Sequence, residues 1–159
     1  MENVGGTVVM VHAVAALFVL VLGPVQFIRR TKDRVHRYLG RVWLATMVLT
    51  CASSFAIMPD GFSWLHGLAI FTLFSVAVGW IHARRHEWRA HAGWMLGAYT
   101  GTAIAFVFAA VVPARTIQRT LADDPGFAAV TLAVVLSLSA ALFLGLRHGV
   151  EDVASQADD

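Results

Sequence analysis

The sequence contains few charged residues and only one cysteine. Charged side chains make up only 14% of its 159 residues, against about 25% in typical soluble domains. The single cysteine, Cys51, excludes an internal disulfide and a thiolate metal cluster. Hydrophobic residues, by contrast, make up 58% of the chain, and the mean hydropathy is +0.68. This composition excludes an ordinary soluble domain and predicts an integral membrane protein.

Long windows without charged residues indicate where the helices lie. Each window provides roughly the 20 residues that are needed to cross a hydrocarbon core of about 30 Å. We therefore predict an all-α membrane protein, a single domain over residues 1–159, with transmembrane helices at about 4–28, 38–58, 63–83, 90–113 and 126–147. The first four are expected to form an up-down bundle, with the fifth helix peripheral to it. The acidic tail at 149–159 is expected to be disordered.

The basic residues predict the orientation of these helices. If the N-terminus is outside, the cytoplasmic segments hold ten Lys and Arg residues, and only Arg115 and Arg119 remain outside. This bias predicts a protein of the bacterial inner membrane with its N-terminus outside and its C-terminus in the cytoplasm. The net charge of +2 reflects topology and contact with anionic lipid, so nucleic acid is not expected as a partner. The five tryptophans are expected to form an aromatic belt at the ends of the spans.

Four histidines form two pairs with nearly equal separations. His12 and His66 are 54 residues apart, and His36 and His91 are 55 residues apart. Their flanking residues repeat as well, because Arg34-Val35-His36 is echoed by Arg89-Ala90-His91, which predicts an old duplication of a two-helix unit. In an up-down bundle the members of each pair lie on diagonal helices and face one central axis.

Two imidazoles that face each other across apolar walls suit a six-coordinate haem iron, which has two axial positions free for protein ligands. Zinc or copper would need three or four ligands, and the spans contain no carboxylate. The candidate metal ligands are therefore His12, His66, His36 and His91. Arg37 and Arg41 are candidates for clamping the haem propionates.

Each candidate also has a structural interpretation. A histidine within a span, such as His12, can hydrogen-bond inside the bundle, and His66 near the interface costs little without a ligand. His36 and His91 lie beside basic residues that serve topology and lipid binding. For Arg37 and Arg41, anchoring by the positive-inside rule is the simpler role.

The arrangement of helix-borne histidines on two diagonals, near opposite faces, resembles that of the two-haem b-type transmembrane cytochromes. That family passes electrons among ascorbate, superoxide, quinone and ferric iron, and residues 4–113 would be the matching core. The sequence also contains the motifs His36-Arg37-Tyr38-Leu39-Gly40-Arg41-Val42-Trp43, Ser53-Ser54-Phe55, Gly61-Phe62-Ser63-Trp64-Leu65-His66, and His91 with Met95. In these motifs the chain resembles a family of bacterial membrane proteins of unknown function, and at the level of residues this second resemblance is the closer one.

The leading functional hypothesis is a membrane protein with one or two haem b groups held by histidine pairs. It would exchange electrons with a quinone or a small reductant, which makes a membrane oxidoreductase or electron carrier the expected class. The alternative is a non-catalytic subunit or assembly factor, within a homo-oligomer or a larger membrane complex, whose histidines are structural. A proton-coupled carrier is the weakest of the three, because carriers typically have broken helices and carboxylates within the membrane.

Overall fold

The chain folds into helices throughout the part that can be described. The computed structural model describes residues 2–29, 33–57 and 61–111, together with five single positions further on. Four helices lie in these ranges, α1 (Glu2–Ile28), α2 (Arg34–Ser54), α3 (Trp64–Arg84) and α4 (Trp88–Val111). No strand occurs in the same ranges, so the predicted all-helical fold is confirmed for them.

The expected fifth helix at 126–147 and the expected acidic tail at 149–159 lie outside the described residues, apart from the five single positions. Those five are helical in conformation and their side chains are exposed; they are Gly126, Ala129, Ala133, Ser137 and Leu144.

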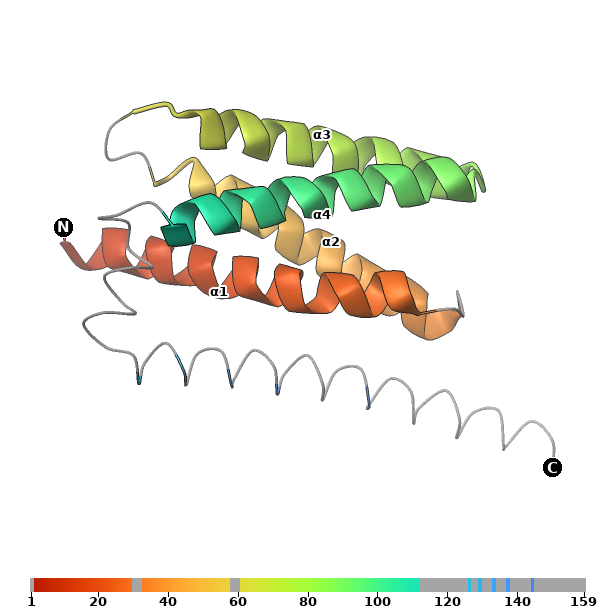
Figure 1. The fold of residues 1–159 in the computed structure, drawn as a ribbon, viewed down its shortest axis with the longest axis horizontal. Helices are drawn as coiled ribbons and strands as arrows, with labels where there is room; N and C mark the ends of the chain where they lie inside the picture. Colours follow the sequence, from red (N-terminus) through yellow and green to blue (C-terminus); the bar gives the residue numbers. More distant parts are fainter. Residues whose placement is uncertain are drawn as a thin grey trace.

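The four helices pack as two antiparallel hairpins (Figure 1). The helices α1 and α2 form one hairpin, and α3 and α4 form the other. The hairpins join through contacts of α2 with α3 and of α1 with α4. As a result, the α1–α2 turn and the α3–α4 turn lie at the same end of the structure (Figure 1).

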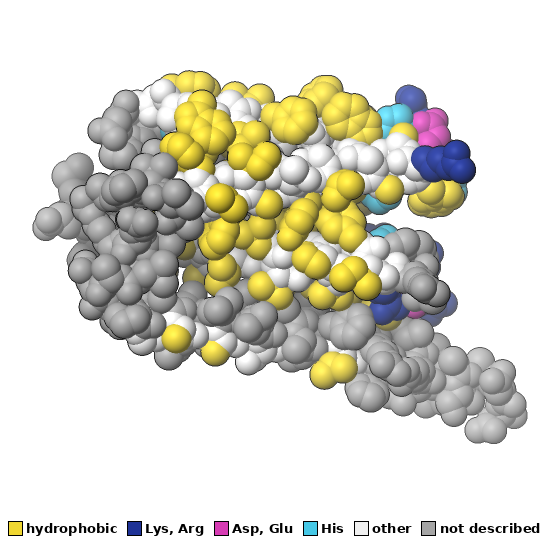
Figure 2. All heavy atoms as spheres, viewed as in Figure 1, with side chains coloured by type: hydrophobic (Ala, Val, Ile, Leu, Met, Phe, Trp, Pro, Cys, Tyr) yellow, Lys and Arg dark blue, Asp and Glu magenta, His cyan; other side chains and the backbone are white. Residues whose placement is uncertain are grey.

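Three of the four helices are long and apolar enough to cross a membrane, by length and composition. They are α1 from Gly6 to Ile28, all of α3, and α4 from Trp88 to Ala109. The helix α2 does not qualify, because its first two turns carry three arginines. In Figure 2, hydrophobic side chains cover the visible faces of the described helices, and charged and histidine side chains gather at the end with the two turns.

The helix α2 begins at Arg34, four residues before the start at residue 38 that the sequence predicts. Asp33 caps its N-terminus, because a carboxylate oxygen accepts the backbone N–H of His36 at 3.1 Å. The second carboxylate oxygen pairs with Arg29 at 2.7 Å. A capped first turn satisfies backbone donors that would otherwise lack partners, so α2 can start at Arg34 despite the charges that follow.

The α3–α4 turn is short because α3 ends in a Schellman motif. The N–H of Glu87 donates to the carbonyl of His82 at 3.0 Å, and the N–H of His86 donates to that of Ala83 at 3.2 Å. His86 takes the left-handed conformation, with φ of 61°, which is usually left to glycine. The His82 ring also contacts the Glu87 carboxylate and closes the turn from the side-chain side.

The core lies between the two hairpins, and α2 contributes its largest share. Trp43 is 4% exposed and its indole N–H donates to the carbonyl of Val19 at 3.0 Å. The expectation that Trp43 belongs to an aromatic belt is therefore wrong, whereas Trp64, Trp80 and Trp88 are exposed as a belt requires. The core cluster consists of Val19 and Leu22 from α1, Val35, Leu39, Trp43, Met47 and Cys51 from α2, Val76 from α3, and Met95 and Ala98 from α4.

A proline inside α1 explains one contact between α1 and α4. Pro24 has no N–H, so the carbonyl of Leu20, four residues earlier, has no partner within the helix. The hydroxyl of Tyr99 donates to this carbonyl at 3.2 Å. Tyr99 comes this close because Gly23 lies beneath its ring, where a Cβ atom would be 2.5 Å from the ring carbon Cε2. The proline, glycine and tyrosine thus form one joint between the two hairpins.

Replacement of Tyr99 by phenylalanine tests this joint. Without the hydroxyl, the carbonyl of Leu20 would face an apolar interior unpaired, and we expect the free energy of unfolding to fall by about 0.6 kcal/mol. Thermal unfolding in detergent, followed by circular dichroism, measures the change. The matched control is Thr100→Val, which removes a hydroxyl at the exposed neighbouring position. Equal losses from the two substitutions would contradict the proposed role of Tyr99.

Candidate functional site

His12 connects α1 to the last turns of α2. Its Nδ1 lies 3.0 Å from the carbonyl oxygen of Thr50 and 3.0 Å from the hydroxyl of Ser53. Since a carbonyl can only accept, Nδ1 carries the proton of the neutral ring and Nε2 does not. The ring is half-buried.

His66 lies at the same end of α2 but uses both of its ring nitrogens. The backbone N–H of Ser63 donates to Nδ1 at 2.9 Å, and Nε2 lies 3.2 Å from the carbonyl of Ser54. In a capping box, the third helical residue reaches back to the cap, and His66 does so in place of the usual Glu or Gln. Buried to 5% exposure and packed against Phe55 and Phe62, it is held as a structural residue in this arrangement.

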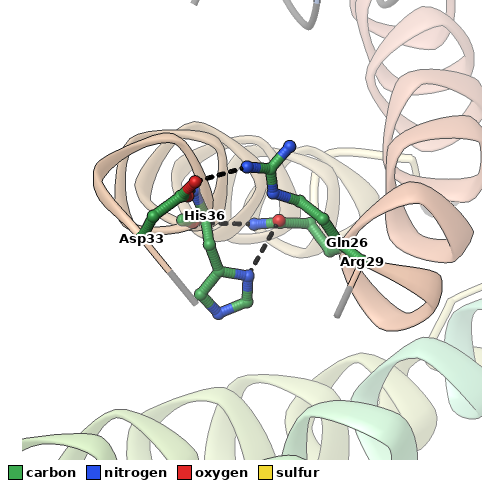
Figure 3. A network of polar contacts seen from close by, with 4 residues as sticks. All are labelled: Gln26, Arg29, Asp33 and His36. Carbon is green, nitrogen blue, oxygen red and sulfur yellow. Dashed lines mark hydrogen bonds and ion pairs between the residues drawn. The ribbon is translucent and has the colours of Figure 1, made fainter. Parts of the chain in front are cut away.

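His36 is held by Gln26 at the opposite end of the α1–α2 hairpin (Figure 3). The side-chain amide nitrogen of Gln26 donates to the carbonyl of His36 at 3.1 Å, so its oxygen faces Nδ1 of the ring, also at 3.1 Å. Because this oxygen accepts, the proton lies on Nδ1 here too. Figure 3 shows that Arg29 and Asp33 complete the network beside it.

His91 makes the corresponding contact in the second hairpin. Its Nδ1 lies 2.9 Å from the carbonyl of Gly79 in α3, which again assigns the proton to Nδ1. Its backbone N–H donates to the carbonyl of Glu87 at 3.0 Å. His36 and His91 thus each lie in the first turn of the second helix of a hairpin, and each donates Nδ1–H to an oxygen in the last part of the first helix.

Each predicted pair of histidines lies at one end of the bundle, with His36 and His91 at the end where the two turns lie. His12 and His66 both contact the final turns of α2, through Thr50, Ser53 and Ser54. Within the described ranges, no hydrogen bond joins the two members of either pair directly, and no group of three or more His, Cys, Asp or Glu is arranged to hold a metal ion.

Arg37 and Arg41, predicted to clamp propionates, are both exposed. By helical periodicity, they lie on the side of α2 opposite to the buried Val35, Leu39 and Trp43. Their positions therefore favour a partner outside the bundle.

Two residues of the site are absent from the sequence-based candidates. Gln26 fixes the ring of His36, and Ser63 fixes that of His66. The signal for Ser63 is present in the sequence, since Ser63 and His66 have the spacing of a capping box. For Gln26 the available signal is that a polar residue stands within an apolar window. Such a residue must find a hydrogen-bond partner when it is buried, and Gln26 is 7% exposed in the structure.

The helices, the apolar spans and the polar contacts between them define a helical membrane protein. Residues 9–146 match the family described as "Predicted membrane protein (DUF2306)". The chain belongs to this family, in agreement with the expected membership of a family of membrane proteins of unknown function. No curated protein and no solved structure matches the chain.

The cap of α2 gives a testable pH dependence. The backbone N–H of His36 and, after it, the nearby Arg29 lower the pKa of Asp33 from its ordinary 3.8. A lowered pKa means that Asp33 stabilises the fold fully above pH 3.8, and this contribution is lost as the pH falls through the lowered pKa. At pH 7 we expect Asp33→Ala to lower the free energy of unfolding by about 1 kcal/mol. Asp33→Asn keeps a capping oxygen, so it should lower the free energy of unfolding by less than half as much.

Thermal unfolding in detergent at pH 7 and at about pH 3 measures both variants against the unsubstituted protein. The unsubstituted protein and Asp33→Asn should differ less at the lower pH, because a larger fraction of the carboxyl is then protonated. If the difference in stability between these two proteins is the same at both pH values, the proposed role of the Asp33 carboxylate is contradicted.

Proposed function

We propose that the protein binds haem b inside its helical bundle and transfers electrons between a quinone or small reductant and an acceptor. The observation that carries this proposal is the set of hydrogen bonds that three of its histidines make through Nδ1. His12, His36 and His91 each donate Nδ1–H to an oxygen acceptor, so Nε2 is the unprotonated nitrogen of each neutral ring. Proteins commonly prepare a histidine for metal ligation in this way, because the hydrogen bond at one nitrogen fixes the tautomer and raises the basicity of the other.

The best-suited pair is His36 with His91. Both rings are half-buried, and each is oriented by an oxygen on the neighbouring helix, Gln26 Oε1 for one and Gly79 O for the other. Haem bound here would supply a one-electron redox couple, and the two imidazoles would hold it. The chain's part would be to present two neutral rings at the end of the bundle where the turns lie.

The second pair, His12 with His66, fits less well. His12 is oriented like the other two, but Ser63 and Ser54 occupy both ring nitrogens of His66. Ligation by His66 would require its ring to leave the cap of α3. The pair near the turns is therefore the stronger candidate.

We also propose the finer topology. The helices α1 to α4 would cross the bacterial inner membrane as an up-down bundle, with the N-terminus outside and a fifth helix beside them. Support comes from the gathering of Arg and His side chains at the end with the two turns (Figure 2), which the positive-inside rule assigns to the cytoplasm.

A non-catalytic membrane subunit with structural histidines is the second candidate function. It is favoured by His66, whose two ring nitrogens are both used to hold the α2–α3 connection in place. In that case the hydrogen bonds of the other three histidines would serve only to join helices.

Absorption spectroscopy of the purified protein, expressed with ample haem supply, distinguishes the two functions. Haem with two imidazole ligands should give a low-spin b-type spectrum with sharp bands on reduction. His36→Ala and His91→Ala should each abolish the same spectral component. His86→Ala, at an exposed position in the α3–α4 turn, is the control and should leave the spectrum unchanged. Colourless protein would favour the structural subunit.

Reporter fusions test the topology. Reporters inserted after Asp60 and Asp124 should lie outside, and those in the α1–α2 and α3–α4 turns should lie in the cytoplasm, because the basic residues decide the orientation. A cytoplasmic reporter at Asp60 would overturn the proposed crossing of α2.

A further inference from the structure

One face of the first two turns of α2 carries three exposed arginines. Arg34, Arg37 and Arg41 follow one another at intervals of three and four residues, which places them on the same side of the helix. Tyr38 lies on this side as well and is 51% exposed. In the part of the chain that the structure describes, none of the three guanidinium groups pairs with a carboxylate. We call these four residues the arginine face.

The arginine face extends to a depth at which α1 is entirely apolar. His36 is level with Gln26 of α1, since the two are joined by hydrogen bonds, and Trp43 is level with Val19. Arg41 lies between these two contacts. Its backbone is therefore level with the second half of the α1 span, well short of the end of that span at Ile28.

The apolar part of α2 is too short to cross a bilayer without including Arg41. The thirteen residues from Val42 to Ser54 reach about 20 Å at the rise of an α-helix. The hydrocarbon core is about 30 Å thick. If α2 crosses the membrane beside the other three helices, the guanidinium of Arg41 starts within the hydrocarbon and must reach toward the headgroups.

The same face of α2 continues toward its C-terminus with apolar side chains. Val48 is 41% exposed and Leu49 is 48% exposed. In a membrane, an exposed apolar face of this kind contacts lipid tails. The arginines lie on the same face nearer to the end of the helix, so their neighbours are lipid headgroups. Unpaired positive charge at this depth is costly unless an anion accompanies it.

We propose that the arginine face binds the phosphate of an anionic phospholipid. Arginine suits this ligand because its guanidinium makes two parallel hydrogen bonds to phosphate oxygens. The hydroxyl of Tyr38 supplies a further donor at headgroup level. Binding draws the headgroup toward Arg41 and compensates for the short apolar part of α2. This site lies outside the bundle and does not depend on the binding of haem.

The test compares lipids of different charge with the purified protein in neutral detergent micelles. Addition of dioleoyl phosphatidylglycerol should raise the unfolding temperature of the unsubstituted protein, because a ligand that binds only the folded state stabilises it. Dioleoyl phosphatidylcholine at the same mole fraction should raise it much less. In Arg37→Gln/Arg41→Gln, we expect phosphatidylglycerol to bind about fivefold more weakly for each arginine removed.

Arg84→Gln/Arg85→Gln is the matched control, since it removes two exposed arginines from the same end of the bundle. It should keep the response to phosphatidylglycerol. Native mass spectrometry, which counts bound lipid molecules directly, should show loss of one bound phosphatidylglycerol only in the α2 variant. If the double variant does not fold, Arg37→Gln alone should show part of the same loss. Equal responses in the α2 and α3 variants, or equal stabilisation by the two lipids, would overturn the proposal.

Discussion

Polar groups inside a membrane bundle must find their partners within the protein, because lipid tails offer none. This constraint explains the contacts that hold the two hairpins together. Pro24 leaves the carbonyl of Leu20 without a helical donor, and Tyr99 supplies one from α4. The buried Trp43 meets the same requirement by donating to the carbonyl of Val19. Both contacts fix α1 in register with its neighbours, and the register then determines which residues face the histidines.

The same constraint determines which ring nitrogen of each neutral histidine carries the proton. A half-buried imidazole beside a backbone carbonyl or an amide oxygen must direct its N–H toward that oxygen. At His91 the oxygen belongs to Gly79, and at His36 it belongs to Gln26, whose own orientation is set by its bond to a carbonyl. Packing of the helices therefore leaves Nε2 as the basic nitrogen in both hairpins. Whether this basicity serves a metal or only the hydrogen bond is the question that separates the two proposed functions.

The sequence predicted the approximate places of the four helices that the structure describes, because hydropathy reports the average environment of a whole segment. It could not predict features that depend on one contact. The start of α2 depends on the cap by Asp33, which offsets the charges that follow. The burial of Trp43 depends on how closely α1 approaches α2. The histidines were found as candidates from their spacing, but their hydrogen-bond partners, such as Gln26, come from the neighbouring helix and have no motif.

The two ends of the bundle differ in how much freedom their histidines have. His66 is fixed by contacts at both nitrogens within the α2–α3 connection, so moving it would uncap α3. In the part of the chain that the structure describes, His91 is held through its Nδ1, and its partner is the backbone of α3. A residue oriented by backbone keeps its position when neighbouring side chains change. The imidazole near the turns therefore depends little on neighbouring side chains, whereas His66 is part of the scaffold that joins α2 to α3.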